Sequence, residues 1–233
     1  MSLPFFYETE IPKTSSHLTL SEETSKHCIQ ALRMKTGERL QLTNGRGILY
    51  TASIVSEDKK KTVVLIEESK NISQSVKKIS VCISLLKNAN RFEWFLEKAT
   101  EIGVSEIQPL ICNRTEHTRF RYDRMNGILI AAMLQSQQVW LPVLHEPIPF
   151  KNIVQRSAYS QKLIAHCEAE KKQFINNLPN SPEIQILIGP EGDFTPEEIK
   201  LALHNHYLPV TLGQTRLRAE TAGVVAASLL VNR

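Results

Sequence analysis

The sequence predicts an α/β protein made of two parts, a small β-rich N-terminal domain and a larger domain built around a parallel sheet. Three observations lead to this prediction. Apolar and polar residues alternate before residue 70, and short apolar runs followed by helical patterns occupy the chain from residue 79. A polar stretch without periodicity separates the two patterns. A chain of 233 residues is long enough for both domains.

The N-terminal part carries the period of two that is typical of half-buried strands. Apolar residues alternate over residues 40–42 and 48–54, and Asn44-Gly45 between them is a strong hairpin signal. A short helix is expected to begin at Ser21, whose side chain can cap it. Several short strands at this spacing predict a small barrel.

The polar segment of residues 69–78 is the expected linker. The predicted domains are therefore residues 1–70 and 74–233. In the second domain the expected strands are VCISLL, EIQPLI, KLIAHC, EIQILIG and PVTLG. Such short apolar runs, each followed by a helical pattern, indicate a parallel sheet that is buried on both faces.

Helix boundaries in the second domain follow from local signals. Gly103 is a natural C-terminal stop for the helix that precedes it. Thr195-Pro196-Glu197-Glu198 forms a capping box with proline at the first helical position. Two more helices are expected over residues 121–138 and 220–232. The last one is apolar on all sides, which predicts burial in a core or against a partner.

Composition narrows the functional classes. The chain is 42% hydrophobic and 22% charged, its start lacks a basic and apolar leader, and no apolar run approaches the length of a membrane helix. We therefore expect a soluble, cytoplasmic protein. The four cysteines form no C-x-x-C pair, so neither a metal site nor a disulfide framework is expected, and a reducing compartment fits better.

The net charge of +4 permits nucleic-acid binding without arguing for it. The distribution of the charge says more, because four arginines lie within eleven residues. They are Arg114, Arg119, Arg121 and Arg124. Such a cluster can hold several phosphates, although a solvated loop followed by an exposed helix face explains it equally well.

Two glycine-bearing segments follow predicted strands. They are residues 188–194 (IGPEGDF) and 212–222 (LGQTRLRAETA). Open parallel sheets bind ligands beyond the carboxyl ends of their strands, and glycine lets a ligand approach the backbone closely. Neither segment matches a dinucleotide or P-loop fingerprint. From the residues alone, the two segments could bind any of many small ligands, or they could be ordinary strand-to-helix turns.

The same two segments resemble the RsmE family. IGPEGDFTPEEI is similar to its pattern of an aliphatic residue, GPEG, an aromatic residue and a capping box. LGQTRLRAETAGVVAA is similar to its partner, in which LG leads to LR-x-ETA. Residues 87–104 (KNANRFEWFLEKATEIGV) resemble the family's lysine-led helix, and residues 27–37 (HCIQALRMKTG) resemble its H-x5-R-x3-G element. These motifs stand in family order and cover most of the chain.

The chain departs from the family pattern at two places. The family commonly has GPEGG where this chain has Gly192-Asp193, which removes a flexible position. It also often has an acid and an arginine around the QS of residues 134–138, where this chain has LQSQQ. The second departure puts in doubt an RNA or catalytic role for that helix end.

The resemblance implies S-adenosylmethionine (SAM)-dependent methylation of N3 of a uridine in the decoding region of 16S ribosomal RNA (rRNA). It also implies the fold of the SPOUT superfamily, an α/β domain with a deep trefoil knot that grips SAM. The residues carried over to SAM binding are Ile188, Gly189, Pro190, Glu191, Gly192, Leu212, Gly213, Leu217 and Arg218. Core packing is the alternative for the apolar ones, and both roles are compatible.

Methylation at N3 requires removal of the N3 proton. A cation beside the uracil carbonyls favours the anion, and a carboxylate can accept the proton. Arg218 is the candidate cation, and Glu191 or Glu220 is the candidate acceptor. For Glu220, stabilisation of the first turn of a helix is an equally good explanation.

The resemblance further implies that the N-terminal barrel is PUA-like and positions RNA. Arg33 matches the family's arginine there, with a structural salt bridge as the alternative. The cluster of Arg114, Arg119, Arg121 and Arg124 would grip the RNA backbone. SPOUT enzymes generally dimerise through the knotted domain, so a homodimer is expected.

Two other functions stay open from the sequence. One is a non-catalytic RNA-binding or ribosome-assembly factor that keeps the fold. The other is a SPOUT methyltransferase acting on another position, such as a transfer RNA or a ribose hydroxyl.

Overall fold

The computed structural model describes residues 3–12, 16–168 and 171–232. The chain divides into two compact units. The first comprises residues 1–74 together with residues 133–141, and the second comprises residues 75–132 and 142–233. Each unit has its own hydrophobic core.

The first unit is built on a five-stranded sheet within its described residues, in the order β1-β3-β4-β5-β2. The strands are β1 (Phe5–Tyr7), β2 (His17–Thr19), β3 (Arg39–Thr43), β4 (Ile48–Ser56) and β5 (Val63–Asn71). The predicted hairpin is confirmed, because β3 and β4 pair antiparallel on either side of Gly45. The short strands β1 and β2 were not predicted. The predicted alternation is confirmed in β4, where Tyr50, Ala52 and Ile54 are buried.

The helical part of the first unit starts as the sequence predicts. Helix α1 (Glu22–Lys26) is capped by Ser21, whose Oγ accepts a hydrogen bond from the backbone N–H of Thr24 at 3.3 Å. It continues as one π-helical turn over His27–Ala31. Trp140 completes the unit, because its Nε1 donates to the backbone oxygen of Ile72 at 2.9 Å.

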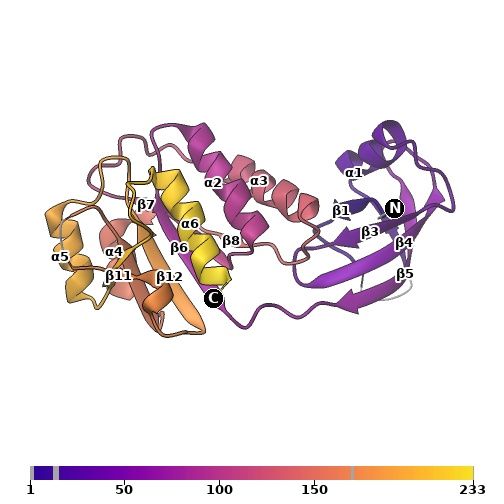
Figure 1. Cartoon of the computed structure of the whole chain (residues 1–233). Coiled ribbons are helices and arrows are strands. Elements are labelled where there is room, and N and C mark those ends of the chain that lie inside the picture. Colours follow the sequence, from indigo (N-terminus) through magenta and orange to yellow (C-terminus); the bar gives the residue numbers. More distant parts are fainter. Residues whose placement is uncertain (1–2, 13–15, 169–170, 233) are drawn as a thin grey trace. The chain divides into compact units, whose positions relative to one another are not determined.

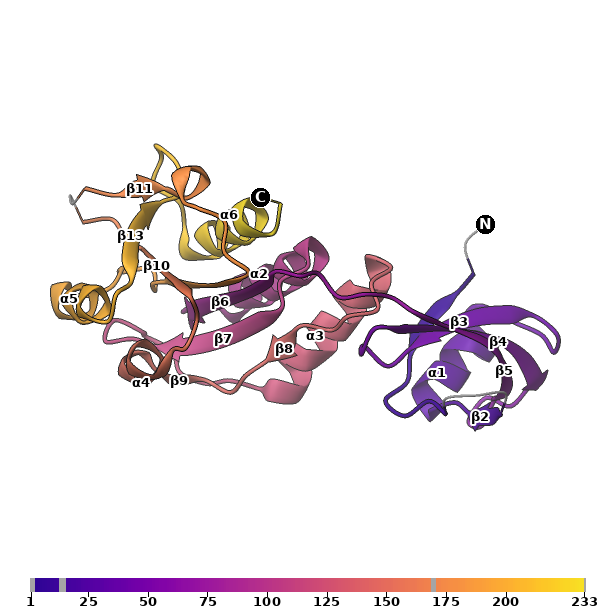
Figure 2. The same ribbon diagram turned by 90° about the horizontal axis from the view of Figure 1, so that it is seen from below.

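The second unit contains a parallel sheet, as predicted. Among the described residues the strand order is β11-β13-β10-β12-β6-β7-β8, and β9 also pairs with β7 (Figure 2). The strands are β6 (Lys78–Ser84), β7 (Glu106–Ile111), β8 (Val143–Leu144), β9 (Ile148–Pro149), β10 (Gln161–Ala165), β11 (Gln173–Phe174), β12 (Glu183–Ile188) and β13 (Leu208–Thr211). The five predicted strands of this domain are therefore present.

Helices cover both faces of this sheet (Figure 1). They are α2 (Ala89–Ile102), α4 (Phe150–Arg156), α5 (Pro196–His204) and α6 (Ala219–Val231). Helix α3 (Tyr122–Gln135) begins in the second unit, and its residues 133–135 belong to the first. Helices α2 and α6 pack against each other on one face, and α4 and α5 pack together against the other. Gly223 permits the first contact, because a Cβ there would lie 2.7 Å from a ring carbon of Phe95.

Local end signals were read correctly. Gly103 ends α2 in the left-handed conformation, with φ of 93°. Both hydrogen bonds of the capping box between Thr195 and Glu198 are formed at the start of α5. None of the helices in the described part of the chain has the length and apolar character needed to cross a bilayer.

Candidate functional site

The second unit contains a cavity of about 460 Å³ beyond the carboxyl ends of three neighbouring strands. Its lining residues come from three segments. We call these segments the β10 wall (Ala165, His166 and Cys167), the β12 turn (Gly189–Asp193) and the β13 turn (Leu212–Arg218). Within the two turns, Gly192 and Gln214 do not line the cavity. The lining is completed by Ile188, Val210, Thr211, Ala219 and Ala222. The volume lies within the range of small-molecule sites.

Strand order explains why these segments meet. Strand β10 pairs with β12 on one side and with β13 on the other. All three strands are parallel, so their carboxyl ends lie at one edge of the sheet. The two glycine-bearing segments singled out in the sequence therefore line a single cavity, with the end of β10 between them.

The β12 turn is shaped by its own backbone and by Asp193. The backbone N–H of Asp193 donates to the carbonyl oxygen of Pro190 at 2.9 Å, and Asp193 has a φ of 64°. Its carboxylate accepts two backbone hydrogen bonds, from Phe194 at 2.8 Å and from Cys167 at 2.7 Å. The second bond joins the β12 turn to the β10 wall.

Two other segments hold the β12 turn. Arg114 donates from Nη1 to the backbone oxygens of Gly192 at 2.6 Å and Phe194 at 3.3 Å. The backbone N–H of Lys87 donates to Oε1 of Glu191 at 3.1 Å. The turn is thus bonded to the segments that follow β6, β7 and β10.

The β13 turn has a different character. Its described hydrogen bonds are local, with Thr211 Oγ1 donating to the oxygen of Gly213 at 2.8 Å and accepting from its N–H at 3.4 Å. Most of its residues are exposed, including Arg216 and Arg218. The cavity therefore has carboxylates on its β12 side and guanidinium groups on its β13 side, which suits a ligand that carries both charges.

Eight of the nine residues predicted to bind the cofactor line the cavity. The ninth, Gly192, lies against the Arg114 side chain, and a Cβ there would lie 3.3 Å from Arg114 Cδ. A Cβ on Gly189 would face the turn itself, 3.1 Å from the nitrogen of Phe194. The tight space at these two glycines is thus set by the protein's own atoms.

The three candidate catalytic residues lie in different surroundings. Arg218 and Glu191 line the cavity and are exposed. Glu220 is buried in the first turn of α6 and is absent from the lining. Its Oε1 lies 3.7 Å from Nε of Arg91 on α2.

Sequence reasoning missed the β10 wall, and it noted Asp193 only as a departure from the family pattern. The other lining residues that were not predicted are Val210, Thr211, Thr215, Arg216, Ala219 and Ala222. A signal for the wall existed, since KLIAHC was identified as a strand and ligands bind beyond strand ends. What the sequence lacked was the strand order that places β10 between β12 and β13.

The four predicted RNA-binding arginines of residues 114–124 are all exposed, and two of them are bonded within the protein. Arg114 holds the β12 turn, and Arg124 forms a bidentate ion pair with Glu93 at 2.6 and 2.9 Å. The pKa of Glu93 is lowered, mainly by this hydrogen bond with Arg124. Arg119 and Arg121 are exposed, and Arg33 is exposed in the first unit with a φ of 56°.

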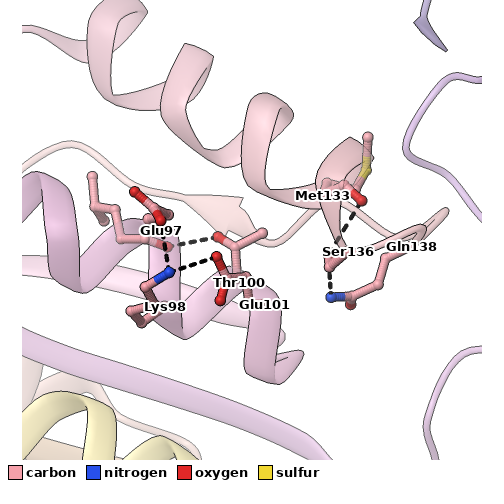
Figure 3. A network of polar contacts seen from close by, with 8 residues as sticks. Glu97, Lys98, Thr100, Glu101, Met133, Ser136 and Gln138 are labelled. Atoms are coloured by element: carbon pink, nitrogen blue, oxygen red, sulfur yellow. Dashed lines mark hydrogen bonds and ion pairs between the residues drawn. The ribbon is translucent and has the colours of Figure 1, made fainter. Parts of the chain in front are cut away.

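The departing segment LQSQQ closes the end of α3 with neutral groups (Figure 3). Ser136 Oγ donates to the oxygen of Met133 at 3.3 Å, and Gln138 Nε2 donates to Ser136 Oγ at 2.8 Å. The same figure shows Lys98 of the KATEIGV motif on α2, whose Nζ donates to Glu97 at 2.7 Å and Glu101 at 2.9 Å. These two bonds of Lys98 stay within α2.

The cysteines differ in accessibility. Cys28, Cys82 and Cys112 are buried, and burial raises the pKa of each thiol to about 12. Cys167 on the β10 wall is exposed, and its pKa is raised by partial burial and then by Asp193. Across residues 3–12, 16–168 and 171–232, no group of three or more His, Cys, Asp or Glu side chains is arranged to hold a metal.

Comparison with known proteins gives two family matches. A family described as the RNA methyltransferase domain matches residues 73–231, and one described as the RNA methyltransferase PUA domain matches residues 20–67. Together they cover β3, β4 and part of β5 in the β-rich unit and all the strands of the parallel sheet.

Individual relatives agree with these matches. A Synechocystis protein named ribosomal RNA small subunit methyltransferase E is 30% identical over 90% of this chain and 71% of its own length. A Legionella pneumophila methyltransferase solved with bound SAM is 31% identical, with a TM-score of 0.89 over 99% of this chain and 97% of that one. A Neisseria gonorrhoeae ribosomal RNA small subunit methyltransferase E bound to SAM is 27% identical, with a TM-score of 0.89 over 97% and 96%.

Proposed function

This chain belongs to the RNA methyltransferase family, in the group of the ribosomal RNA small subunit methyltransferase E proteins, and from that premise we propose that it methylates N3 of a uridine in 16S rRNA with SAM as methyl donor. We assign RNA positioning to residues 1–70 and SAM binding and catalysis to residues 74–233. The enzyme acts in the cytoplasm on the small ribosomal subunit.

The observation that carries the proposal is the meeting of the β12 and β13 turns in one cavity. Both turns bear the motifs that resemble this family, and two of the related structures contain SAM. The charges of the cavity fit SAM, which has an ammonium group, a sulfonium and a carboxylate. Arg216 on the β13 side suits the carboxylate, and the negative charge of the β12 side favours the cationic groups.

SAM, when bound, supplies a methyl group on a positively charged sulfur. The protein has to hold the uracil in line with that methyl group and to remove its N3 proton. Arg218 lines the cavity and is exposed, so its guanidinium stabilises the charge that develops on the uracil carbonyls. This role requires no covalent step on the protein.

We assign proton acceptance to Glu191 in preference to Glu220. Glu191 lines the cavity, and its carboxylate is held in place by the backbone N–H of Lys87. Glu220 lies outside the lining and faces Arg91. We assign Glu220 to the packing of α6 against α2.

RNA binding is assigned to the exposed cations. All four arginines of the cluster are exposed, but the side chains of Arg114 and Arg124 are bonded within the protein, which leaves Arg119 and Arg121 as the candidates. Charge reversal at Arg119 and Arg121 is expected to weaken RNA binding and to reduce its salt dependence by about one per lost phosphate contact. An unchanged salt dependence would exclude these two residues.

A homodimer is part of the proposal. Helix α6 buries one apolar face, while Val224, Val225 and Leu229 are only partly buried in the single chain. Partly exposed apolar residues on a helix of this kind suit a second copy as partner. Mass measurement in solution at micromolar concentration tests it, and a monomer mass would contradict it.

The decisive experiment combines binding with chemistry. Calorimetry with SAM is expected to give one site per chain, and absence of binding would favour a non-catalytic RNA-binding factor. Mass spectrometry of 16S rRNA from a deletion strain is expected to lack one 3-methyluridine, which returns on complementation. Its persistence in the deletion strain would move the activity to another RNA position.

A further inference from the structure

We propose that Asp193 is a positioning residue that fixes the β10 wall of the cavity against the β12 turn and thereby preorganises the site for its ligand. The choice of SAM as that ligand rests on the function proposed above. The positioning role itself rests on the geometry around Asp193.

The first observation is the conformation of Asp193. Its φ of 64° lies in the left-handed region, which glycine adopts without strain and most other residues avoid. Aspartate tolerates this region better than most residues because its short side chain can bond to nearby backbone. A non-glycine residue held there beside a cavity suggests that its side chain has a role.

The second observation is what the side chain does. Oδ1 accepts from the N–H of Phe194 within the turn, and Oδ2 accepts from the N–H of Cys167 on a different strand end. Both bonds are short, at 2.8 and 2.7 Å, and both have a charged acceptor, which makes them stronger than neutral ones. One carboxylate therefore orders its own turn and joins that turn to the β10 wall.

The third observation is the position of the joined wall. The sheet pairing of β10 ends at Ala165, which pairs with Ile188 and Val210. His166 and Cys167 extend beyond that pairing, yet they line the cavity between the two turns. The bond from Cys167 to Asp193 thus supplies, at this point, a connection that the strand ladder no longer provides.

These observations define a role separate from catalysis. A wall held before the ligand arrives avoids the entropy of ordering it on binding, so the bond is expected to act on affinity. Its loss should raise the dissociation constant for SAM and change the rate of transfer at saturating SAM much less.

Asp193→Gly is the informative variant, because glycine keeps the backbone conformation and removes both bonds. The SAM dissociation constant is expected to rise about tenfold, and the Cys167 amide should exchange with solvent at least tenfold faster in the ligand-free protein. The melting temperature should stay close to that of the wild type, because strain at a positive φ is relieved. Asp193→Asn keeps a neutral acceptor, so its SAM dissociation constant and its Cys167 amide exchange rate should lie between those of the wild type and of Asp193→Gly.

Glu168→Gln is the matched control. It removes one negative charge from the exposed residue next to Cys167 and leaves the bond from Cys167 to Asp193 intact. Its SAM affinity and Cys167 amide exchange should stay within twofold of the wild type. Equal losses in this control and in Asp193→Gly would overturn the proposal in favour of a general charge effect.

Cys167 provides a second readout, since the other three thiols are buried. SAM is expected to slow the alkylation of Cys167 in the wild type, because Cys167 lines the cavity.

The possible failures are distinguishable. Failure of the wild type to bind SAM contradicts the proposed function, whereas exchange at Cys167 without ligand still decides the positioning role. The positioning role is overturned if the Cys167 amide exchanges no faster in Asp193→Gly than in the wild type. It is also overturned if that amide exchanges faster while the SAM dissociation constant does not change.

Discussion

The two turns that line the cavity differ in how they are held. The β12 turn is bonded to three other segments, through Asp193 and Cys167, through Arg114, and through Lys87 and Glu191. The β13 turn has only local hydrogen bonds among its described residues, and most of its side chains are exposed. We infer that the β12 turn is the fixed side of the site, where Glu191 is held in place, and that the β13 turn presents Arg218 from a less constrained segment.

This difference predicts separate consequences for mutation. Changes in the β12 turn, apart from the proposed proton acceptor Glu191, should disturb the fold of the turn and the binding of SAM. Changes at exposed side chains of the β13 turn should alter methyl transfer while sparing stability.

Arg218→Ala is expected to have the largest effect. Loss of a cation that stabilises developing charge lowers the rate by about 10²- to 10³-fold. The side chain makes no capping bond to α6, so the free energy of unfolding should change by less than about 0.5 kcal/mol. Single-turnover methylation of small subunits measures the rate.

Arg156→Ala, at the exposed end of α4, is the control for loss of one positive charge. Its rate should remain near that of the wild type. An Arg218→Ala enzyme that retains half of the wild-type rate would contradict the assignment of the β13 turn to catalysis.

Glu106, at the amino end of β7, lies away from the cavity and allows a test of stability without an effect on the site. His145 and Lys78 beside the carboxylate hold the pKa of Glu106 at about 2, well below its ordinary value of 4.5. A carboxylate whose pKa is lowered in the folded protein stabilises the fold at any pH above its ordinary pKa. For Glu106 this contribution is about 3 kcal/mol at most, and it is lost as the pH falls from about 4.5 towards 2.

Urea denaturation across this pH range measures the effect. Glu106→Gln should lack this part of the acid destabilisation and should bind SAM normally at neutral pH. An identical pH dependence in both proteins would show that the ion pairs of Glu106 contribute nothing.

A glycine-to-alanine pair tests the two turns directly. In Gly189→Ala the new Cβ lies 3.1 to 3.3 Å from Phe194 and Asp193, so unfolding free energy should fall by about 1–3 kcal/mol. In Gly213→Ala nothing lies within 4 Å of the Cβ, so the change should be within about 0.5 kcal/mol. Chemical denaturation compares them, and equal losses would remove the distinction between the turns.

Arg114→Ala is expected to have a smaller effect. Loss of its bonds to Gly192 and Phe194 should weaken SAM binding about tenfold, the equivalent of one hydrogen bond to a charged group. The salt dependence of RNA binding should not change. Arg119→Ala should leave SAM affinity unchanged and should reduce the salt dependence of RNA binding. If Arg114→Ala instead reduced the salt dependence and left SAM affinity unchanged, Arg114 would be an RNA-binding residue.

The features that sequence reasoning found depend on neighbours in the chain. Ser21, Gly103 and the capping box at Thr195 are local signals, because a cap bonds to residues at most a few positions away. The two cavity turns were found through family motifs together with the rule that ligands bind at strand ends.

The features that it missed depend on contacts between distant residues. Arg114 looked like part of a basic cluster, yet it bonds to a turn 78 residues away. The β10 wall could not be placed because no local pattern gives strand order. The trefoil knot stays a prediction for the same reason, since it is a property of the whole chain path.

Strand order also has a consequence for synthesis on the ribosome. Strand β12 lies between β6 and β10, although it is made after both of them. One edge of β6 therefore stays unpaired until about a hundred more residues have been synthesised, although the apolar residues of β6 are already present. Such an unpaired edge invites association with other chains, so nascent or truncated forms that end before residue 183 are expected to depend on chaperones.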